Sequence, residues 1–351
     1  MPQNALVVNE LGGPLALVER ATPSPLAGEV LVRIEAAGLN PHDQKGRDNG
    51  LFVNPPGAIL ANDIAGVVES VGSNVTKFNK GDRIFGQSSL LGRGPDAAGL
   101  QQYCVLEADV SAHIPPSISF EEAATIPVNA IASFVAIFHS TGLGVGFPRV
   151  VKESLDKQNI VIVGGGTSTG KFAIQFAKLA GFGGIIALAS LASEDELREL
   201  GATHVVDRHA PDVGARVETL VGDDLIYVVD MVSRGDNQSF PVSLLSNTEK
   251  GEYASLVPGK VTEETAKLKK ASFERKGVLG LSHKHRDICV PFWDNISDWI
   301  VDGTVKVQRY AVVDGLDAEK VNALLDCYRD GVPTTKTLIR PNKLFSVRDS
   351  T

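Results

Sequence analysis

The chain has 351 residues, more than one hydrophobic core usually serves, so two domains are expected. Its hydrophobic content of 43% and charged content of 22% are ordinary for a globular protein. The formal net charge of −8 argues against nucleic acid or an anionic membrane as a general partner.

Targeting and redox signals point to a cytoplasmic protein. No run of about 18 apolar residues predicts a membrane span, and residues 1–13 lack the basic and apolar regions of a secretory signal. The three cysteines, Cys104, Cys289 and Cys327, are far apart. This spacing fits a reducing compartment and neither a disulfide framework nor a metal site.

The first third of the chain reads as short strands separated by turns, which suggests an antiparallel, barrel-like module. The strand candidates, rich in valine, leucine and isoleucine, lie within residues 4–10, 29–40, 65–75, 83–85 and 100–116.

The pattern changes near residue 120, where Glu121 and Glu122 follow a serine and precede a long apolar run. This predicts a capped helix start, and Pro127 allows a kink or a break. Strands and helices then alternate, as in a parallel, doubly wound sheet. The expected strands are 159–165, 184–190, 203–207, 225–233, 253–259 and 277–282, with helices at 168–180 and 194–200. Residues 321–342 read as a helix, a turn and a strand that return to the first module.

A glycine-rich loop lies between the strand NIVIVGG and the helix that follows it. Gly164, Gly165 and Gly166 permit tight turning and close backbone approach, and Gly170 allows close packing of helix on strand. The N-terminus of such a helix offers N–H groups to a pyrophosphate. In this loop Thr167, Ser168 and Thr169 stand at and beside places where the dinucleotide fingerprint has glycine, and we expect them to add hydroxyl donors.

The end of the second parallel strand helps to choose the cofactor. NAD-binding proteins usually have an acidic residue there, whereas this strand ends in Ala189 and Ser190. Arg208, after the third strand, can supply a positive charge to a 2′-phosphate. We therefore favour NADPH and expect Glu194 only to favour the start of the next helix.

The order of barrel module, doubly wound domain and short return resembles the medium-chain dehydrogenases/reductases over essentially the whole chain. The segments AAGLNPHD, NDIAGVVESVGSNVTKFNKGDRIFG and SISFEEAATIP carry this resemblance. It implies an α/β chain with a GroES-like β-barrel catalytic domain, at 1–123 and 285–351, and a Rossmann domain at 124–284.

The alcohol dehydrogenases of this superfamily carry a catalytic zinc, but the corresponding places here are unsuitable for it. The resemblance puts Asn40 in the place of a cysteine ligand and Asn62, followed by Asp63, in the place of a histidine ligand. Amides are poor zinc ligands, so we expect no metal. The histidines His283 and His285, around a lysine, are expected to be solvated surface.

Within the superfamily the chain most resembles zinc-free quinone reductases and the trans-acting enoyl reductases of fungal polyketide assembly. The motifs are LNPHDQK at 39–45, YVVDMVS at 227–233 and SLVP at 255–258. The resemblance implies catalytic or positioning roles for Lys45, Asn40 and Ser133. It implies cofactor contacts for a larger set: Gly165, Gly166, Thr167, Ser168, Thr169, Gly170, Ser190, Ser193, Arg208, Asp230, Leu256 and Val257.

These observations predict an NADPH-dependent, zinc-independent reductase of a carbon–carbon double bond conjugated to a carbonyl, acting in a cleft between the two domains. Quinone reduction, alcohol or carbonyl dehydrogenation, and NADPH binding without catalysis stay open as alternatives. The substrate is expected to be a small molecule or carrier-bound, with a polyketide synthase as an expected partner and a monomer or homodimer as the oligomeric state. The stretches 47–57 and 88–99 are expected to line the substrate entrance.

Overall fold

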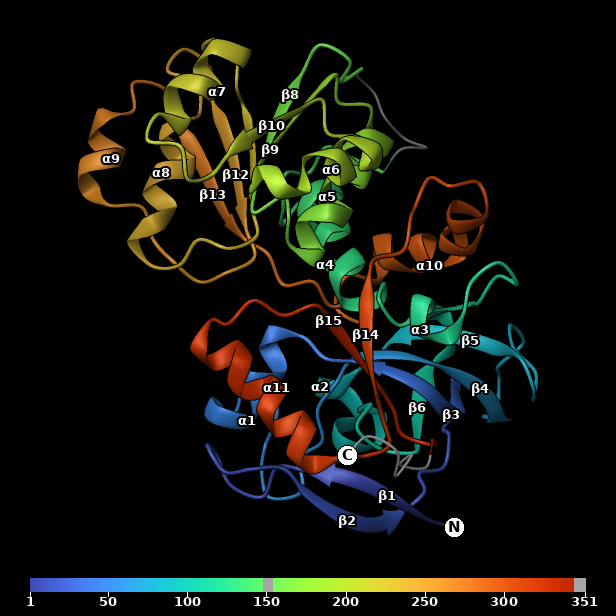
Figure 1. Cartoon of the computed structure of the whole chain (residues 1–351). Coiled ribbons are helices and arrows are strands. Elements are labelled where there is room, and N and C mark those ends of the chain that lie inside the picture. Colours follow the sequence, from blue (N-terminus) through green and yellow to red (C-terminus); the bar gives the residue numbers. More distant parts are fainter. Residues whose placement is uncertain (148–153, 344–351) are drawn as a thin grey trace. The chain divides into compact units, whose positions relative to one another are not determined.

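The computed structural model describes residues 1–147 and 154–343 (Figure 1). The chain divides into two compact units. The barrel unit comprises Met1–Val128, Ser282–Gly303 and Val307–Thr351, and the parallel-sheet unit comprises Asn129–Leu281 and Thr304–Lys306. The sequence analysis places the domain boundaries after residues 123 and 284, and these boundaries stay a prediction.

The barrel unit is built on mixed, largely antiparallel strands. The strands β1 (Pro2–Val7) and β2 (Ala16–Ala21) form a separate antiparallel pair. A larger sheet has the order β14-β15-β3-β4-β5-β7, and β6 also pairs with β3. Its strands are β3 (Glu29–Gly38), β4 (Asp63–Val71), β5 (Arg83–Gln87), β6 (Tyr103–Glu107), β7 (Ser111–His113), β14 (Tyr310–Asp314) and β15 (Lys336–Arg340). Because β15 pairs with β3, the C-terminal part of the chain completes this sheet, as the sequence predicts.

The barrel unit also contains helices of 4 to 16 residues, and α11 lies beside α1 in Figure 1. They are α1 (Pro41–Asn49), α2 (Leu90–Arg93), α3 (Phe120–Ala123), α10 (Arg286–Val301) and α11 (Ala318–Asp330). The predicted serine cap is confirmed, because the Ser119 hydroxyl accepts a hydrogen bond from the Glu122 N–H at 3.0 Å. The predicted break is confirmed too, since α4 (Pro127–Phe138) begins anew at Pro127.

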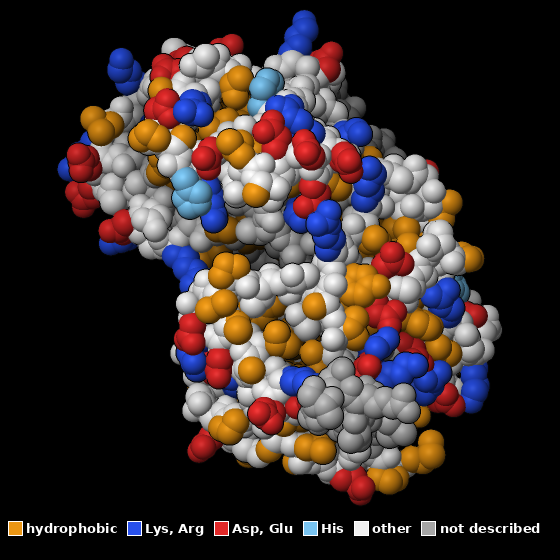
Figure 2. Space-filling view, in the orientation of Figure 1, with side chains coloured by type: hydrophobic (Ala, Val, Ile, Leu, Met, Phe, Trp, Pro, Cys, Tyr) orange, Lys and Arg blue, Asp and Glu red, His pale blue; other side chains and the backbone are white. Residues whose placement is uncertain are grey.

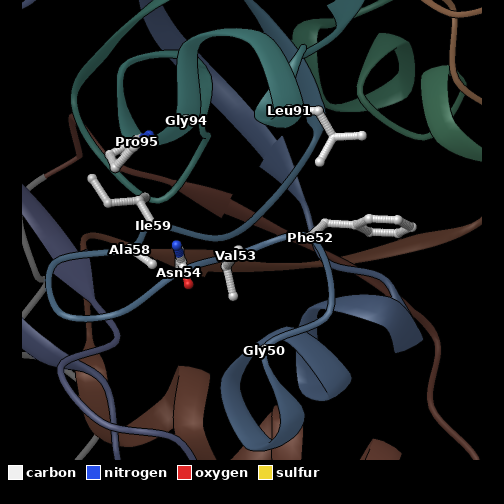
Figure 3. Close-up of a pocket in the computed structure, with 9 residues that line it drawn as sticks. All are labelled: Gly50, Phe52, Val53, Asn54, Ala58, Ile59, Leu91, Gly94 and Pro95. Carbon is white, nitrogen blue, oxygen red and sulfur yellow. The ribbon is translucent and has the colours of Figure 1, made fainter.

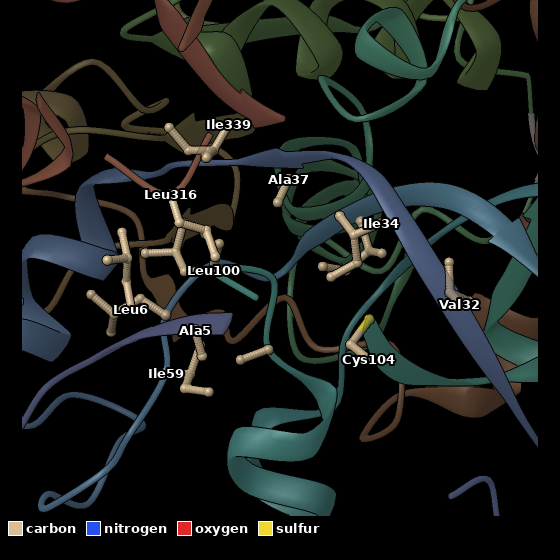
Figure 4. Close-up of a cluster of buried hydrophobic side chains, with 14 of the residues drawn as sticks. Ala5, Leu6, Val32, Ile34, Ala37, Ile59, Leu100, Cys104, Leu316 and Ile339 are labelled. Carbon is tan, nitrogen blue, oxygen red and sulfur yellow. The ribbon is translucent and has the colours of Figure 1, made fainter. Parts of the chain in front are cut away.

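The core of the barrel unit gathers side chains from distant segments (Figure 4). Leu6 from β1, Ile34 from β3 and Ile339 from β15 are fully buried in it. Ile59 and Leu100, from loops, fill the same cluster. The unit therefore has a hydrophobic core of its own, to which the last strand of the chain contributes.

The parallel-sheet unit has six strands in the order β10-β9-β8-β11-β12-β13, all parallel. This order is that of a doubly wound Rossmann sheet. The strands are β8 (Asn159–Val163), β9 (Gly184–Ala189), β10 (His204–Asp207), β11 (Tyr227–Asp230), β12 (Gly251–Ser255) and β13 (Phe273–Gly277). The helices are α4, α5 (Ser168–Ala180), α6 (Glu194–Leu200), α7 (Val213–Val221), α8 (Ser239–Ser243) and α9 (Glu263–Leu268).

The predicted bounds of α5 and α6 are confirmed, whereas the last strand is misplaced in the prediction. It covers Phe273–Gly277 and not the apolar stretch 277–282. An edge strand has only one paired side, so a polar sequence such as FERKG is tolerated there. The stretch 277–282 was predicted as a strand only because its composition is apolar.

The helical stretch Phe120–Phe138, which comprises α3, α4 and the turn between them, is long and apolar enough to cross a membrane by length and composition alone. The sequence analysis does not expect such a stretch. Its apolar window is 72% buried inside the protein. Burial of this extent is that of a core helix.

Candidate active site

The glycine loop of the parallel-sheet unit is tightly constrained at three of its glycines. A Cβ atom on Gly170 would lie 2.2 Å from the carbonyl oxygen of Gly164, and one on Gly165 would lie 2.8 Å from the Cβ of Ala187. Gly164 itself has a φ of +81°, which disfavours other residues. These three glycines are therefore required by the turn and by helix–strand packing.

Gly166 is different, because packing of the protein does not require a glycine there. A Cβ atom on Gly166 would meet only Ala189 Cβ at 3.6 Å and Ser193 Oγ at 3.8 Å, which are ordinary contact distances. Close approach of a ligand's phosphate to the backbone explains the absence of a side chain at such a position. The loop therefore fits a dinucleotide pyrophosphate.

The loop hydroxyls serve the loop itself more than the sequence suggests. Thr167 caps α5: its hydroxyl accepts from the Gly170 N–H at 3.0 Å and donates to the Gly164 carbonyl at 2.8 Å. The Thr169 hydroxyl donates to the Asn129 Oδ1 at 3.0 Å. Two of the three hydroxyls expected to face a ligand are thus used to hold the turn. The backbone around Gly166 and Ser168 is left as the better candidate for phosphate binding.

Three residues expected around the 2′-phosphate come together at the end of β9. Ser190 follows Ala189 directly, and Ser193 approaches Gly166 as described. Arg208 is exposed, and its N–H donates to the Ala189 carbonyl at 2.9 Å. Parallel pairing of β9 with β10 causes this arrangement, because Asp207 lies opposite Ala189.

Two acidic residues near this edge pair with basic side chains. Glu194 pairs with Arg198 at 2.8 Å, and Glu196 pairs with Lys171 at 2.7 Å. On the face of the protein shown in Figure 2, acidic and basic side chains lie interspersed. Glu194 thus has the local helix role expected for it.

Asp230, at the end of β11, is fully buried, and both of its carboxylate oxygens have partners. Oδ1 accepts from the N–H groups of Val232 and Ser233, and Oδ2 accepts from the Tyr253 hydroxyl at 2.8 Å. Burial and the neighbouring Asp230 charge raise the pKa of Tyr253 far above its usual value. Asp230 therefore shapes the loop after β11, and its contact with a cofactor stays a prediction.

Leu256 and Val257 lie at the carboxyl end of β12, beside that loop. The Leu256 N–H donates to the Asp230 carbonyl at 3.0 Å. The Val257 carbonyl accepts from the Gln238 amide at 2.7 Å. Both residues are thus held at the edge where parallel sheets bind ligands.

Ser133, on α4, is fully buried in the parallel-sheet unit. Its hydroxyl donates toward the carbonyls of Asn129, at 2.9 Å, and Thr169, at 2.7 Å. This arrangement ties α4 to the first turn of α5. The structure therefore gives Ser133 a packing role, and the catalytic role stays a prediction.

In the barrel unit, Asn40, Asp63 and Lys336 form a buried polar network. The Lys336 ammonium donates to the Asn40 Oδ1 at 2.8 Å, to the Asp63 Oδ2 at 2.5 Å and to the Leu39 carbonyl at 3.0 Å. The Asn40 amide N–H donates to Asp63 at 2.7 Å, and the backbone N–H of Val128 donates to the other Asp63 oxygen at 2.6 Å. All three donors of the ammonium are used. The Asn40 side chain thus faces this network, and its contact with a substrate stays a prediction.

Asn40 also begins α1, the helix that carries Lys45. The Asn40 N–H donates to the Asp43 carboxylate at 2.7 Å, which fixes the first turn. His42 and Lys45 are three residues apart and share a face of the helix. Both are half-buried, and the His42 Nε2 lies 2.9 Å from the Asn62 Oδ1. The predicted residues Asn40 and Lys45 are therefore positioned by one capped helix.

The donor set at the two zinc-ligand places does not fit zinc. Zinc prefers thiolate, imidazole and carboxylate ligands. Asn40 and Asn62 offer neutral amides, and the Lys336 ammonium already binds Asn40 and Asp63. Across residues 1–147 and 154–343, no group of three or more His, Cys, Asp or Glu side chains is placed to hold a metal ion.

The sequence analysis missed Lys336 and misjudged one histidine. Lys336 is the first residue of the strand KTLIR, a place where a lysine is usually exposed, so no local signal marks it as a buried charge with a partner. His285 is only 6% exposed, so the expectation that the His283–His285 stretch is solvated surface is wrong for it. His283 is half-buried, and burial lowers its pKa.

Comparisons with known proteins agree with this architecture. Residues 26–116 match the alcohol dehydrogenase GroES-like domain, and residues 168–289 match the family described as zinc-binding dehydrogenase. The trans-enoyl reductase tndF of Aspergillus flavipes is 30% identical over 346 residues, covering 95% of this chain and 98% of that protein. The enoyl reductase component lovC of lovastatin nonaketide synthase, from Aspergillus terreus, is 33% identical over 261 residues, or 73% of this chain and 70% of that protein.

Solved structures share the fold at lower identity. The Escherichia coli quinone oxidoreductase complexed with NADPH has a TM-score of 0.74 at 22% identity, covering 96% of this chain and 100% of that one. The CurK enoyl reductase has a TM-score of 0.75 at 20% identity, covering 97% of this chain and 99% of that one. The unit organisation, the Rossmann strand order and these relatives together show that the chain belongs to the trans-enoyl reductases, a family of oxidoreductases within the medium-chain dehydrogenases/reductases.

Proposed function

We propose that this protein uses NADPH, without zinc, to reduce a carbon–carbon double bond conjugated to a carbonyl, in an enoyl thioester or an enone. The observation that carries the proposal is the Asn40–Asp63–Lys336 network, because the Lys336 ammonium already occupies the Asn40 and Asp63 oxygens, and amides are poor zinc ligands. Without a Lewis acid, a conjugated double bond is an easier target than an alcohol or ketone. The names of the relatives tndF and lovC support the same reaction.

The choice of NADPH rests on the end of β9. Ser190 and Ser193 offer hydroxyls, and Arg208 offers a guanidinium that pairs well with a phosphate. Glu194, the nearest acid in sequence, pairs with Arg198. Bound NADPH would supply the hydride for the reaction.

The residues of the chain orient the reactants and stabilise charge. Hydride addition at the β-carbon of the substrate moves an electron pair onto the carbonyl oxygen. The Lys45 ammonium, held on α1, donates a hydrogen bond to that oxygen, and such preorganised donors lower the barrier. A proton then reaches the α-carbon from water or a side chain, which gives the saturated product.

The test is NADPH oxidation by the metal-free protein with a crotonyl thioester, beside a panel of enones, quinones and ketones. We expect the conjugated substrates to be reduced and added zinc to have no effect. The Lys45→Met variant should lower kcat about 100-fold or more while NADPH binding persists. Activity that vanishes on chelation and returns with zinc, or turnover of quinones alone, would falsify the proposal.

Three further points are part of the same proposal. The barrel unit acts as the catalytic domain and the parallel-sheet unit as the cofactor domain, with boundaries after residues 123 and 284. The relative lovC is named the enoyl reductase component of lovastatin nonaketide synthase, so we propose a polyketide synthase as the partner. We also propose the cytoplasm as the location. Size-exclusion chromatography with a carrier-bound substrate tests the partner and the monomer or dimer state.

A further inference from the structure

The barrel unit contains a pocket of about 420 Å³, and seven of its nine lining residues lie in the stretches 47–57 and 88–99, which the sequence predicts at the substrate entrance. Two segments form it: the chain after α1 and the turn that contains α2 (Figure 3). A volume of this size lies in the range of small-molecule sites. The lining residues are Gly50, Phe52, Val53, Asn54, Ala58, Ile59, Leu91, Gly94 and Pro95.

The lining is apolar, and two of its residues are part of the hydrophobic core. Ala58 and Ile59 are 3% and 1% exposed and belong to the hydrophobic core of the unit. Phe52 and Val53 pack against that core from the side. Among the lining residues only Asn54 has a polar side chain, and none is charged. Such a pocket favours a hydrocarbon group and disfavours a charged one.

The pocket begins at the end of the helix that carries Lys45. Gly50 ends α1 with a φ of 76°, and it lies five residues after Lys45, or about 8 Å along the helix axis. The Leu51 N–H donates to the Lys45 carbonyl at 3.3 Å. The same short helix thus carries the proposed oxygen-binding group and ends at a lining residue of the apolar pocket.

Phe52 connects the pocket to the polar end of α1. Its ring lies edge-on to the His42 ring, with centroids 6.2 Å apart. Its φ of +63° is uncommon for a residue other than glycine. Backbone strain of this kind persists where surrounding structure holds it, and it is enriched at ligand clamps. Figure 3 shows the side chains of Phe52 and Leu91 extending on the same side of the pocket.

We propose that this pocket binds the hydrocarbon tail of the substrate, with its enoyl carbonyl directed toward Lys45. The inference rests on the proposed function and adds a substrate class: 2-enoyl thioesters with an unbranched apolar tail, in preference to short, polar or ring-shaped acceptors. Charged tails are disfavoured because the lining residues offer them no partner.

The experiment measures kcat/KM for N-acetylcysteamine thioesters of crotonic, hexenoic, octenoic and decenoic acids. For the wild type we expect about a fourfold rise per added methylene until the pocket is full. Leu91→Trp, which fills the pocket, should abolish that rise, so that the ratio of kcat/KM for the decenoyl and crotonyl thioesters approaches one. Leu91→Asp should also penalise the long tails by introducing a charge.

Leu26→Trp is the matched control, because Leu26 is 57% exposed and Leu91 is 58% exposed, and Leu26 does not line the pocket. This variant should keep the wild-type chain-length dependence. Near-equal thermal melting of the variants and the wild type separates a pocket effect from unfolding.

Calorimetry with the saturated decanoyl thioester measures binding of the tail without reduction, and so tests the pocket independently of the reaction. Reduction of crotonyl thioester with no chain-length dependence, and no effect of Leu91→Trp, would overturn the pocket proposal while the proposed function stands. Binding of the decanoyl thioester to the wild type but not to Leu91→Trp, with no thioester reduced, would support the pocket and overturn the function.

Discussion

In the parallel-sheet unit, the residues expected to hold the pyrophosphate follow one another along the chain, whereas the buried network of the barrel unit joins distant segments. The glycine loop occupies 164–170, and its turn is fixed by local backbone geometry. Asn40 and Lys336 are 23 and 273 residues from Asp63, which they both contact. A tight turn can be predicted from a single stretch of sequence, because its glycines are neighbours along the chain. A buried charge network can be predicted only when its distant partners are known.

Removing Lys336 is the strongest way to break the barrel-unit network. Lys336→Met leaves the Asp63 carboxylate buried without its cation, and we expect the free energy of unfolding to fall by about 3–5 kcal/mol. Urea unfolding monitored by circular dichroism measures the loss. The double variant Lys336→Met with Asp63→Asn should recover most of it, because both charges are then absent. A loss below about 1 kcal/mol for the single variant would show that the ion pair is not needed for folding.

Two glycine substitutions separate folding from cofactor binding in the loop. Gly166→Ala should change the free energy of unfolding by no more than about 0.5 kcal/mol and raise the Kd for NADPH at least tenfold, that is by about 1.4 kcal/mol. Gly170→Ala should destabilise the protein by about 1–3 kcal/mol, because its Cβ would meet the Gly164 carbonyl. Calorimetry and thermal melting distinguish the two effects. Unchanged NADPH affinity in Gly166→Ala would place the pyrophosphate elsewhere.

Arg208 tests the choice between the two nicotinamide cofactors. Arg208→Gln should raise the Kd for NADPH about tenfold, because a charged hydrogen bond to the 2′-phosphate is lost, and leave NADH affinity unchanged. Arg216→Gln is a matched control on α7, where the exposed Arg216 pairs with Asp212. Equal weakening of both cofactors by Arg208→Gln would argue against a 2′-phosphate contact.

The smallest expected effect concerns pH. Burial lowers the pKa of His283, so the folded protein binds fewer protons than the unfolded chain once the pH falls below about 6.5. The stability of the wild type should therefore fall as the pH drops from about 7. His283→Asn should make that fall shallower in thermal melts, while His204→Asn, at an exposed histidine, serves as the control. If the stability of His283→Asn fell more steeply with decreasing pH than that of the wild type, the contribution of His283 would have the opposite sign to the one predicted.

Much of the fold follows from pattern. The capped, glycine-ended helix at 168–180 obeys local rules, so its bounds were predictable, and the apolar strand Asn159–Val163 lies within the predicted range 159–165. The polar edge strand β13 was not, because pairing with β12 and not its own composition makes it a strand. The hydrogen bonds of the Thr167 and Thr169 hydroxyls were unpredictable for a similar reason: their partners, Gly164, Gly170 and Asn129, become apparent only when the turn is formed.

The amino-acid sequence by itself determined the doubly wound sheet, the return of the last strand to the first module and the place of the glycine loop, because periodicity and glycine positions act over a few residues. Only the tertiary structure decided that a lysine from β15 neutralises Asp63 beside Asn40, and that the segments after α1 and around α2 enclose one apolar pocket. Burial and charge pairing depend on contacts between residues that are distant in the sequence, and no local sequence pattern predicts those contacts.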